Sequence, residues 1–466
     1  MKGYCRGFPL IQVICFDNNL LYSSTSVKQF LRILFHRDHL IISVLAVMIL
    51  SLFYFVSMNI SFLSPVARAI KDFSMSDLYY HILWTGDEPE KSEVITLVDI
   101  TDLHKRGQIA QTIEEVNKQH PKALGLDIIF EGLKDDSIGN DSLVNALSDC
   151  SSETVTAFKL LDYNAPSKTF TSSLHSFFIN DVPLIEGYTN VLSNGTNGSV
   201  RQFSISRRTR EMEVYSLPAM LYMSAINDTL PSSVKEPEDR MINYVPTRFP
   251  VVRYDSIAQK ADLIRDHIVL LGTVNEEQDM HYTPLGKMPG LEVQAFSLQT
   301  LLSQRDIHVV SEVWLIILAF IFCYLTQFIQ YGAVRLVARR TDTVSIFLSG
   351  SFLFLRVITF SWLGLLAWLG FILYVKCNIY LAMTWIFAPV VLVAESRGLY
   401  SAFVKTLCLK HHDRFKWLKS SLYYVAPEVK TASHDNEELR VESGSADVAD
   451  VNVTDNDVLT PSSNNS

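Results

Sequence analysis

The chain has 466 residues, of which 48% are hydrophobic and only 19% are charged, and its mean hydropathy is positive. This composition is more apolar than that of an ordinary soluble protein and predicts membrane segments. The net charge of −9 argues against nucleic-acid binding, which requires clustered lysine and arginine residues. No pair of cysteines has a metal-ligand spacing such as C-x-x-C.

The first predicted span is 40–62, an uncharged apolar stretch that is long enough to cross about 30 Å of hydrocarbon. Lys28, Arg32 and Arg37 precede this stretch. Because basic residues favour the cytoplasmic side of a membrane, they place residues 1–39 in the cytoplasm.

Three further apolar stretches, at 313–331, 356–375 and 379–395, predict the remaining spans. Basic residues follow the first and the last of them, so the loop 332–355 and the segment 396–466 are expected in the cytoplasm as well. Arg356 then lies at the cytoplasmic end of its helix and reaches the lipid headgroups. This orientation places residues 63–312 outside the inner membrane of the cell, on a multi-pass protein.

Apolar strands alternate with helices in the first part of this outer region. Strands are predicted at 94–100, at 123–130 and from 155 onward, and helices at 108–119 and near 138–149. Near-continuous apolar strands in this order are typical of a parallel sheet covered by helices. The predicted fold is therefore an α/β domain with a largely parallel, helix-covered sheet, attached to four transmembrane helices.

The second part of the outer region is harder to interpret. Short strands are predicted in IEGYTNV, QFSISRRT and MINYV, and a helix at 216–226. A clearer strand at 267–272 ends in Gly272, a polar loop follows, and a helix is predicted at 291–304. A strand that ends in glycine before a polar loop and a helix is common where an α/β sheet carries a site.

Five side chains form the candidate site: Asp99, Asp127, Asp279, His281 and Thr283. Asp99 and Asp127 come late in predicted parallel strands, whose carboxyl ends share one edge of the sheet, and the loop that carries the other three reaches the same edge. Since Asp127 interrupts an apolar run, burial is expected to raise its pKa. Converging carboxylates would suit a divalent cation, or a cationic or hydroxyl-bearing ligand.

A structural role for the same carboxylates is the main alternative. Asp99 and Asp127 would then cap neighbouring helices or accept hydrogen bonds from loop N–H groups. Hydrolytic catalysis ranks last, because no nucleophile or general base has a suitable spacing. We therefore expect no enzyme activity and no cofactor.

Three segments in order, VITLVDIT, KALGLDIIF and HIVLLGTVNEEQDMHYTPLGKMPGLEVQAFSLQTLL, resemble the type-2 CHASE domain, an extracytoplasmic sensory module of bacteria. Together with three trailing membrane helices, they match that family's layout from about residue 64 to about 395. The resemblance implies signal reception, and it implies a homodimer, since receptors of this build often work as dimers. The stretch after Asp99 lacks the Trp/Pro-containing turn of many members.

No kinase or cyclase segment is recognised after residue 396, and the acidic stretch from Glu428 onward is predicted to be disordered. We therefore expect a sensor that sits in the lipid bilayer, detects an unidentified extracytoplasmic ligand or envelope state, and signals to a separately encoded protein. The alternative is a non-signalling envelope scaffold that binds another protein.

Overall fold

The structure is a computed structural model, and it describes residues 34–59, 75–86, 88–150, 153–191, 198–226, 239–303, 305, 307–338, 352–410, 417 and 420–422. The chain divides into a large unit, Met1–Tyr400, and a small one, Ser401–Ser466. The sites discussed below belong to the large unit. Most of the predicted N-terminal segment 1–39, part of the loop 332–355 and the whole acidic stretch from Glu428 onward lie outside the described residues.

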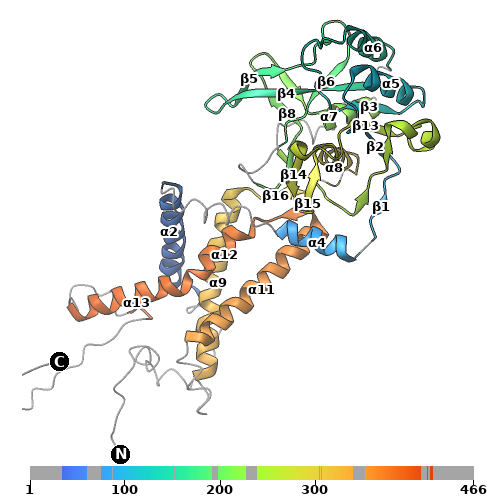
Figure 1. Ribbon diagram of the computed structural model, residues 1–466. Helices are drawn as coiled ribbons and strands as arrows, with labels where there is room; N and C mark the ends of the chain where they lie inside the picture. Colours follow the sequence, from blue (N-terminus) through green and yellow to red (C-terminus); the bar gives the residue numbers. More distant parts are fainter. Residues whose placement is uncertain are drawn as a thin grey trace, which may run out of the picture. The chain divides into compact units, whose positions relative to one another are not determined.

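The α/β domain (residues 88–303) is built on a seven-stranded sheet in the order β12-β2-β13-β3-β4-β5, with β6 also paired to β4 (Figure 1). Its strands are β2 (Ile95–Asp99), β3 (Ala123–Leu126), β4 (Thr154–Asn164), β5 (Thr169–Leu174), β6 (Ile185–Tyr188), β12 (Val251–Arg253) and β13 (Ile268–Gly272). Every pair is parallel except the β4–β5 hairpin. The predicted α/β domain with a largely parallel sheet is confirmed.

Successive residues of these strands point to opposite faces, and each face contributes to its own hydrophobic core. Ile95 and Leu97 of β2 belong to the core that contains α7 (Leu217–Ile226) and α8 (Gly290–Ser303). Val98, from the same strand, belongs to the core that contains α5 (Arg106–Asn117) and α6 (Ser137–Ser148). The apolar runs that predicted buried strands thus supply both cores.

Several short elements complete the domain. The paired strands are β1 (Glu90–Lys91) with β11 (Thr247–Arg248), β7 (Gln202–Ser204) with β10 (Asp239–Met241), β8 (Ser206–Arg208) with β9 (Glu213–Tyr215), and β14 (Met280–Thr283) with β15 (Gly286–Pro289). Short 3-10 helices are η5 (Tyr254–Ser256), η6 (Ala258–Leu263), which is kinked at Lys260, and η7 (Glu277–Asp279). The predicted polar loop after Gly272 therefore contains a turn and a hairpin, and the strand predicted in MINYV reaches only its first residue, Met241.

The membrane part contains α9 (Glu312–Ala338), α11 (Phe352–Cys377), α12 (Met383–Val391) and α13 (Val393–Lys410). Among the described residues, three helical stretches are long and apolar enough to cross a membrane: Glu312–Ala333, Leu353–Cys377 and Met383–Cys408. The last of them begins later than the predicted span 379–395. The first two residues of the predicted span form a short strand instead, β17 (Ile379–Tyr380), which pairs with β16 (His308–Val309).

The predicted first span corresponds to α2 (Arg37–Asn59), apart from residues 60–62, which lie outside the described part of the chain. Ala46 of α2 is buried with Cys323 of α9 and Val390 of α12, so α2 packs against the other helices. Length and composition qualify only the three stretches above as spans within the described residues, so a fourth crossing stays a prediction.

Candidate functional site

The candidate site lies where β2, β13 and β3 end side by side. Gly272 of β13 pairs with Asp99 of β2, and Leu271 pairs with Leu126, the last residue of β3. Asp127 therefore follows its strand and does not lie inside it, although its backbone N–H still donates to Leu271 O at 2.9 Å. Strand alternation directs Asp99 and Asp127 to the face of the sheet that carries α7 and α8.

The Asp99 carboxylate forms hydrogen bonds within a turn. Its Oδ1 accepts hydrogen bonds from Thr101 N at 2.9 Å and from Thr101 Oγ1 at 2.6 Å. The Thr101 hydroxyl in turn accepts from Val274 N at 3.0 Å and Asn275 N at 3.2 Å, in the loop after β13. Asp99 and Thr101 thus fix two loops to each other, as the structural alternative predicted for Asp99. The sequence analysis missed Thr101, although Asp-x-Thr is a known turn pattern.

Asp127 is in a different environment. Although the residue keeps some solvent exposure, protein atoms surround it closely, and this burial raises the pKa of the Asp127 carboxyl to about 7. The negative charge of Asp279 raises this pKa further, and His281 opposes the rise. Among the described residues, no hydrogen bond to the Asp127 carboxylate is found. Asp127, Asp279 and His281 therefore lie close enough to interact electrostatically, and we call them the edge cluster.

The β14–β15 hairpin positions Asp279. Met280 pairs with Pro289, so Asp279 lies beside Gly290, the first residue of α8. A Cβ atom at Gly290 would come within 2.7 Å of both carboxylate oxygens of Asp279, so this approach requires glycine. A carboxylate at a helix N-terminus is stabilised by the helix dipole. His281 Nε2 lies 3.7 Å from Asp279 Oδ1 and completes the edge cluster.

Thr283 belongs to the turn of this hairpin. Its Oγ1 donates to Gly286 O at 2.9 Å and accepts from Leu285 N at 3.2 Å. Gly286 has a φ of +104°, which favours glycine at this turn. Thr283 therefore closes the hairpin, and its hydroxyl is already used for that purpose.

The structure thus brings together three of the five predicted site residues, and Asp99 and Thr283 lie in turns of their own. Gly272 separates the two strand ends, and Leu291 packs beside it, 2.9 Å from where a Cβ would be. Within the described part of the chain, no three His, Cys, Asp or Glu side chains are placed to hold a metal ion. The two carboxylates and the imidazole of the edge cluster suit a polar or cationic ligand.

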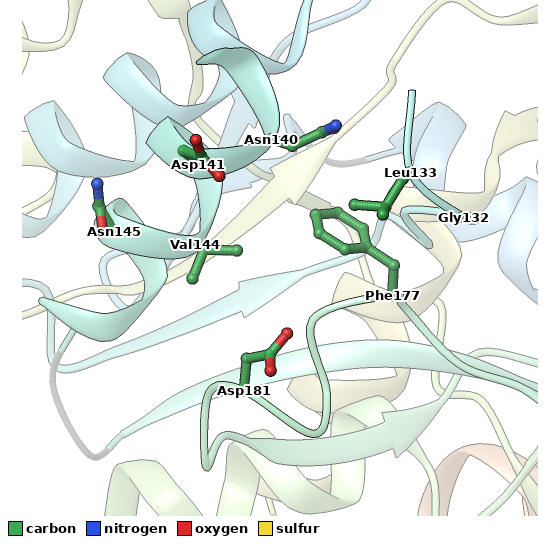
Figure 2. A pocket seen from close by; sticks show the side chains of 8 residues that line it. All are labelled: Gly132, Leu133, Asn140, Asp141, Val144, Asn145, Phe177 and Asp181. Atoms are coloured by element: carbon green, nitrogen blue, oxygen red, sulfur yellow. The ribbon is translucent and has the colours of Figure 1, made fainter. Parts of the chain in front are cut away.

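A separate groove of about 760 Å³ lies beside α6 (Figure 2). It is lined by Gly132, Leu133, Asn140, Asp141, Val144, Asn145, Phe177 and Asp181. The buried Arg106 supports its wall: Nη1 donates to Asn140 Oδ1 at 2.5 Å, Nη2 donates to Gly132 O at 2.7 Å, and the guanidinium lies 4.6 Å from the centre of the Phe177 ring. The sequence analysis missed this groove, because it joins segments that are more than thirty residues apart in the chain.

Comparison with known proteins identifies the domain. The sequence profile of the CHASE2 domain matches residues 44–328, which is more than half of the chain. This chain belongs to the CHASE2 domain family. CHASE2 domains are a sensory family, so the resemblance seen in the sequence is confirmed, and three apolar helices accompany the domain. No curated protein and no solved structure matches the chain.

Proposed function

We propose that this CHASE2 protein is an inner-membrane receptor. Its α/β domain, outside the cytoplasm, detects a ligand or an envelope state at the edge cluster and passes the change through the membrane helices to a separately encoded partner. Support for the detecting role comes from Asp127, a carboxyl group that titrates near neutral pH at the edge of a parallel sheet.

One observation carries the transmitting role: Tyr374 of α11 belongs to the hydrophobic core of the α/β domain. Its hydroxyl donates to Tyr80 Oη at 2.6 Å, and Tyr80 donates to Ile242 O at 3.1 Å, deep in the domain. A shift of this core therefore acts directly on α11, one of the helices that are apolar enough to span the membrane. We call this contact the tyrosine junction.

The helix α8 connects the edge cluster with the tyrosine junction. It begins at Gly290, against the Asp279 carboxylate, and Phe296 in its middle packs on Tyr244 with ring centres 5.1 Å apart. Tyr244 packs on Tyr80 at 5.7 Å. A ligand that binds one arrangement of the edge cluster more tightly would thus shift a continuous set of packed side chains.

A thermal-shift screen of the full-length protein in lipid nanodiscs tests the detecting role, with divalent cations, amines and small polyols as probes. Asp127→Asn and Asp279→Asn should abolish any ligand-linked rise in melting temperature while the unliganded fold survives. Asp99→Asn is the matched control and should keep the response, because an asparagine Oδ1 can still accept from Thr101. A response that all three variants retain would place the ligand elsewhere, for example in the groove beside α6.

Hydrogen exchange tests the transmitting role on the same samples. A probe that raises the melting temperature should change the exchange of the β16 and β17 amides, which adjoin α9 and α11. Tyr374→Phe removes only the hydroxyl of the junction, so it should keep the thermal shift and lose this exchange change. If Tyr374→Phe transmits as well as the natural protein, the tyrosine junction is not the route.

The scaffold alternative has one supporting feature, the β4–β5 hairpin, which extends beyond its neighbours in the sheet (Figure 1). Tyr163 on this hairpin is 54% exposed, and its ring lies 5.0 Å from that of Phe170. Exposed aromatic side chains such as that of Tyr163 are enriched in protein interfaces. Co-purification of an envelope protein with the natural chain, and its loss with Tyr163→Ser, would favour the scaffold.

A further inference from the structure

The helix α4 (Met75–Gly86) exposes an apolar stripe, although it is part of a folded domain. Leu78 is 47% exposed and Ile82 is 49% exposed. Residues three or four apart lie on one face of a helix, and the exposed polar residues His81 and Thr85 share this face with Leu78 and Ile82. The opposite face carries Tyr80, which is only 1% exposed.

Contacts on the other faces of α4 fix its rotation. Asp77 accepts two hydrogen bonds from the buried Arg201, from Nε at 2.9 Å and from Nη2 at 2.6 Å. Trp84 Nε1 donates to Tyr244 O at 2.9 Å. Turning Leu78 and Ile82 inward would break these contacts, so their exposure is built into the fold.

The position of α4 along α11 shows what surrounds this stripe. The ring of Tyr79 lies 4.8 Å from that of Tyr374 and 5.7 Å from that of Phe371. Phe371 is six residues before Cys377, the end of α11, and therefore about 9 Å below that end. Helices at a membrane surface bury their apolar face about 5–10 Å into the boundary of headgroups and acyl chains. The helix α4 therefore packs against the last two turns of the candidate span Leu353–Cys377, the part of a spanning helix that lies nearest the membrane surface.

Nearby surfaces support the same position. Trp314, in the first turn of α9, is 61% exposed, and tryptophan is enriched where a spanning helix meets the membrane surface. Trp368, near the middle of α11, is 62% exposed and belongs to the apolar surface of that span. Both helices are apolar enough to cross a membrane. The stripe on α4 thus lies beside helices whose length and composition suit a lipid environment.

We infer that α4 is an interfacial helix whose Leu78 and Ile82 lie in the lipid leaflet that the α/β domain faces. The occupant is lipid and not a protein, since two aliphatic side chains are far too few for a specific interface, which buries about 1,000 Å² or more. Because α4 also carries Tyr80, lipid, domain core and α11 meet at one short helix. Lipid packing would then act on the tyrosine junction without any soluble ligand, which goes beyond the function proposed above.

Site-specific photocrosslinking of the full-length protein tests this inference. A photoreactive benzoylphenylalanine replaces Leu78, Ile82 or Thr85, and the protein is reconstituted in vesicles of phosphatidylcholine and phosphatidylglycerol. Intact-mass analysis after irradiation separates lipid adducts from protein adducts. Trp368→benzoylphenylalanine is the control in a membrane helix, and Leu133→benzoylphenylalanine is the control at an exposed apolar residue of the α/β domain, 76% exposed.

We expect lipid adducts from the α4 positions in yields within about twofold of position 368 and about tenfold above position 133. Yields at the level of position 133 would overturn the inference, and so would adducts with a second copy or another protein. Thr85 is a second position on the stripe that replaces no apolar side chain, so it keeps the test valid if the Leu78 and Ile82 variants fail to fold.

Discussion

Asp99 and Asp127 occupy equivalent places at the carboxyl ends of two parallel strands, on either side of Gly272, yet their environments differ. Asp99 accepts two hydrogen bonds from Thr101, and through it holds the loop after β13. The Asp127 carboxylate has no hydrogen-bond partner among the described residues, and its pKa is raised to about 7 by burial and by Asp279. Position at the edge of a sheet therefore does not by itself indicate function.

What distinguishes the two carboxylates is whether their charge is compensated. A carboxylate that accepts hydrogen bonds is stabilised in its charged form, and its removal costs folding stability. A carboxylate that is buried beside another carboxylate is destabilised in its charged form, and this lowers the stability of the folded state. Such a cost is usual at functional sites.

The largest effect is expected from Thr101→Val, which keeps the shape of the side chain but removes the hydroxyl. Asp99 loses one donor, and the Val274 and Asn275 N–H groups lose their acceptor, so the free energy of unfolding should fall by about 2–3 kcal/mol. Chemical denaturation of the protein in detergent, followed by fluorescence, measures it. Thr101→Ser keeps the hydroxyl and should lose less than half as much. Equal losses in both variants would mean that the hydrogen bonds are unimportant.

Asp127→Asn is expected to raise the free energy of unfolding, in contrast to Thr101→Val, and the size of this gain should depend on pH. In the folded protein the Asp127 carboxyl has a pKa of about 7, against an ordinary 3.8, so between these values the folded state binds the extra proton. The free energy of unfolding therefore falls as the pH rises through this window and levels off above it. Asparagine does not titrate, so the variant should match the natural protein near pH 4 and exceed it by about 2 kcal/mol at pH 8.

Melting temperatures of the natural protein and of the Asp127→Asn variant across this pH range measure the difference. A constant gap at all pH values would show that Asp127 does not titrate in this window. It would also remove the contrast between the two strand ends.

Asp279→Asn should change the stability of the protein less than Asp127→Asn does. Its charge is the second cause of the raised pKa of Asp127, so its removal should move the pH-dependent fall in stability to lower pH. The variant also loses a favourable charge at the N-terminus of α8, which costs about 0.5 kcal/mol. The same pH series of melting temperatures detects both changes. An unchanged midpoint would mean that Asp279 lies too far from Asp127 to act on it.

The sequence predicted the parallel sheet well, because strands such as 94–100 and 267–272 are short, apolar and flanked by polar residues. It predicted Asp127 and Asp279 as neighbours only through the shared edge. The hairpin that positions Asp279 was missed, because residues 280–289 contain two prolines and a glycine, which is more typical of a loop. The tyrosine junction was also missed, since Tyr80 and Tyr374 are 294 residues apart and no local pattern connects them.

The smallest effect is expected from Asp99→Asn, and it decides whether the charge of Asp99 matters. Asparagine keeps an Oδ1 that can accept from Thr101 N and Oγ1, so the turn should persist, with a loss of about 0.3 kcal/mol in the free energy of unfolding. Chemical denaturation measures this loss, and the loss in Thr101→Val serves as the reference. Asp99→Ala, which removes the acceptor, is the positive control for loss of the turn. If Asp99→Asn instead lost as much stability as Asp99→Ala, the charge itself would be required. Asp99 would then need a cationic partner at this edge, and the two strand ends would belong to one site.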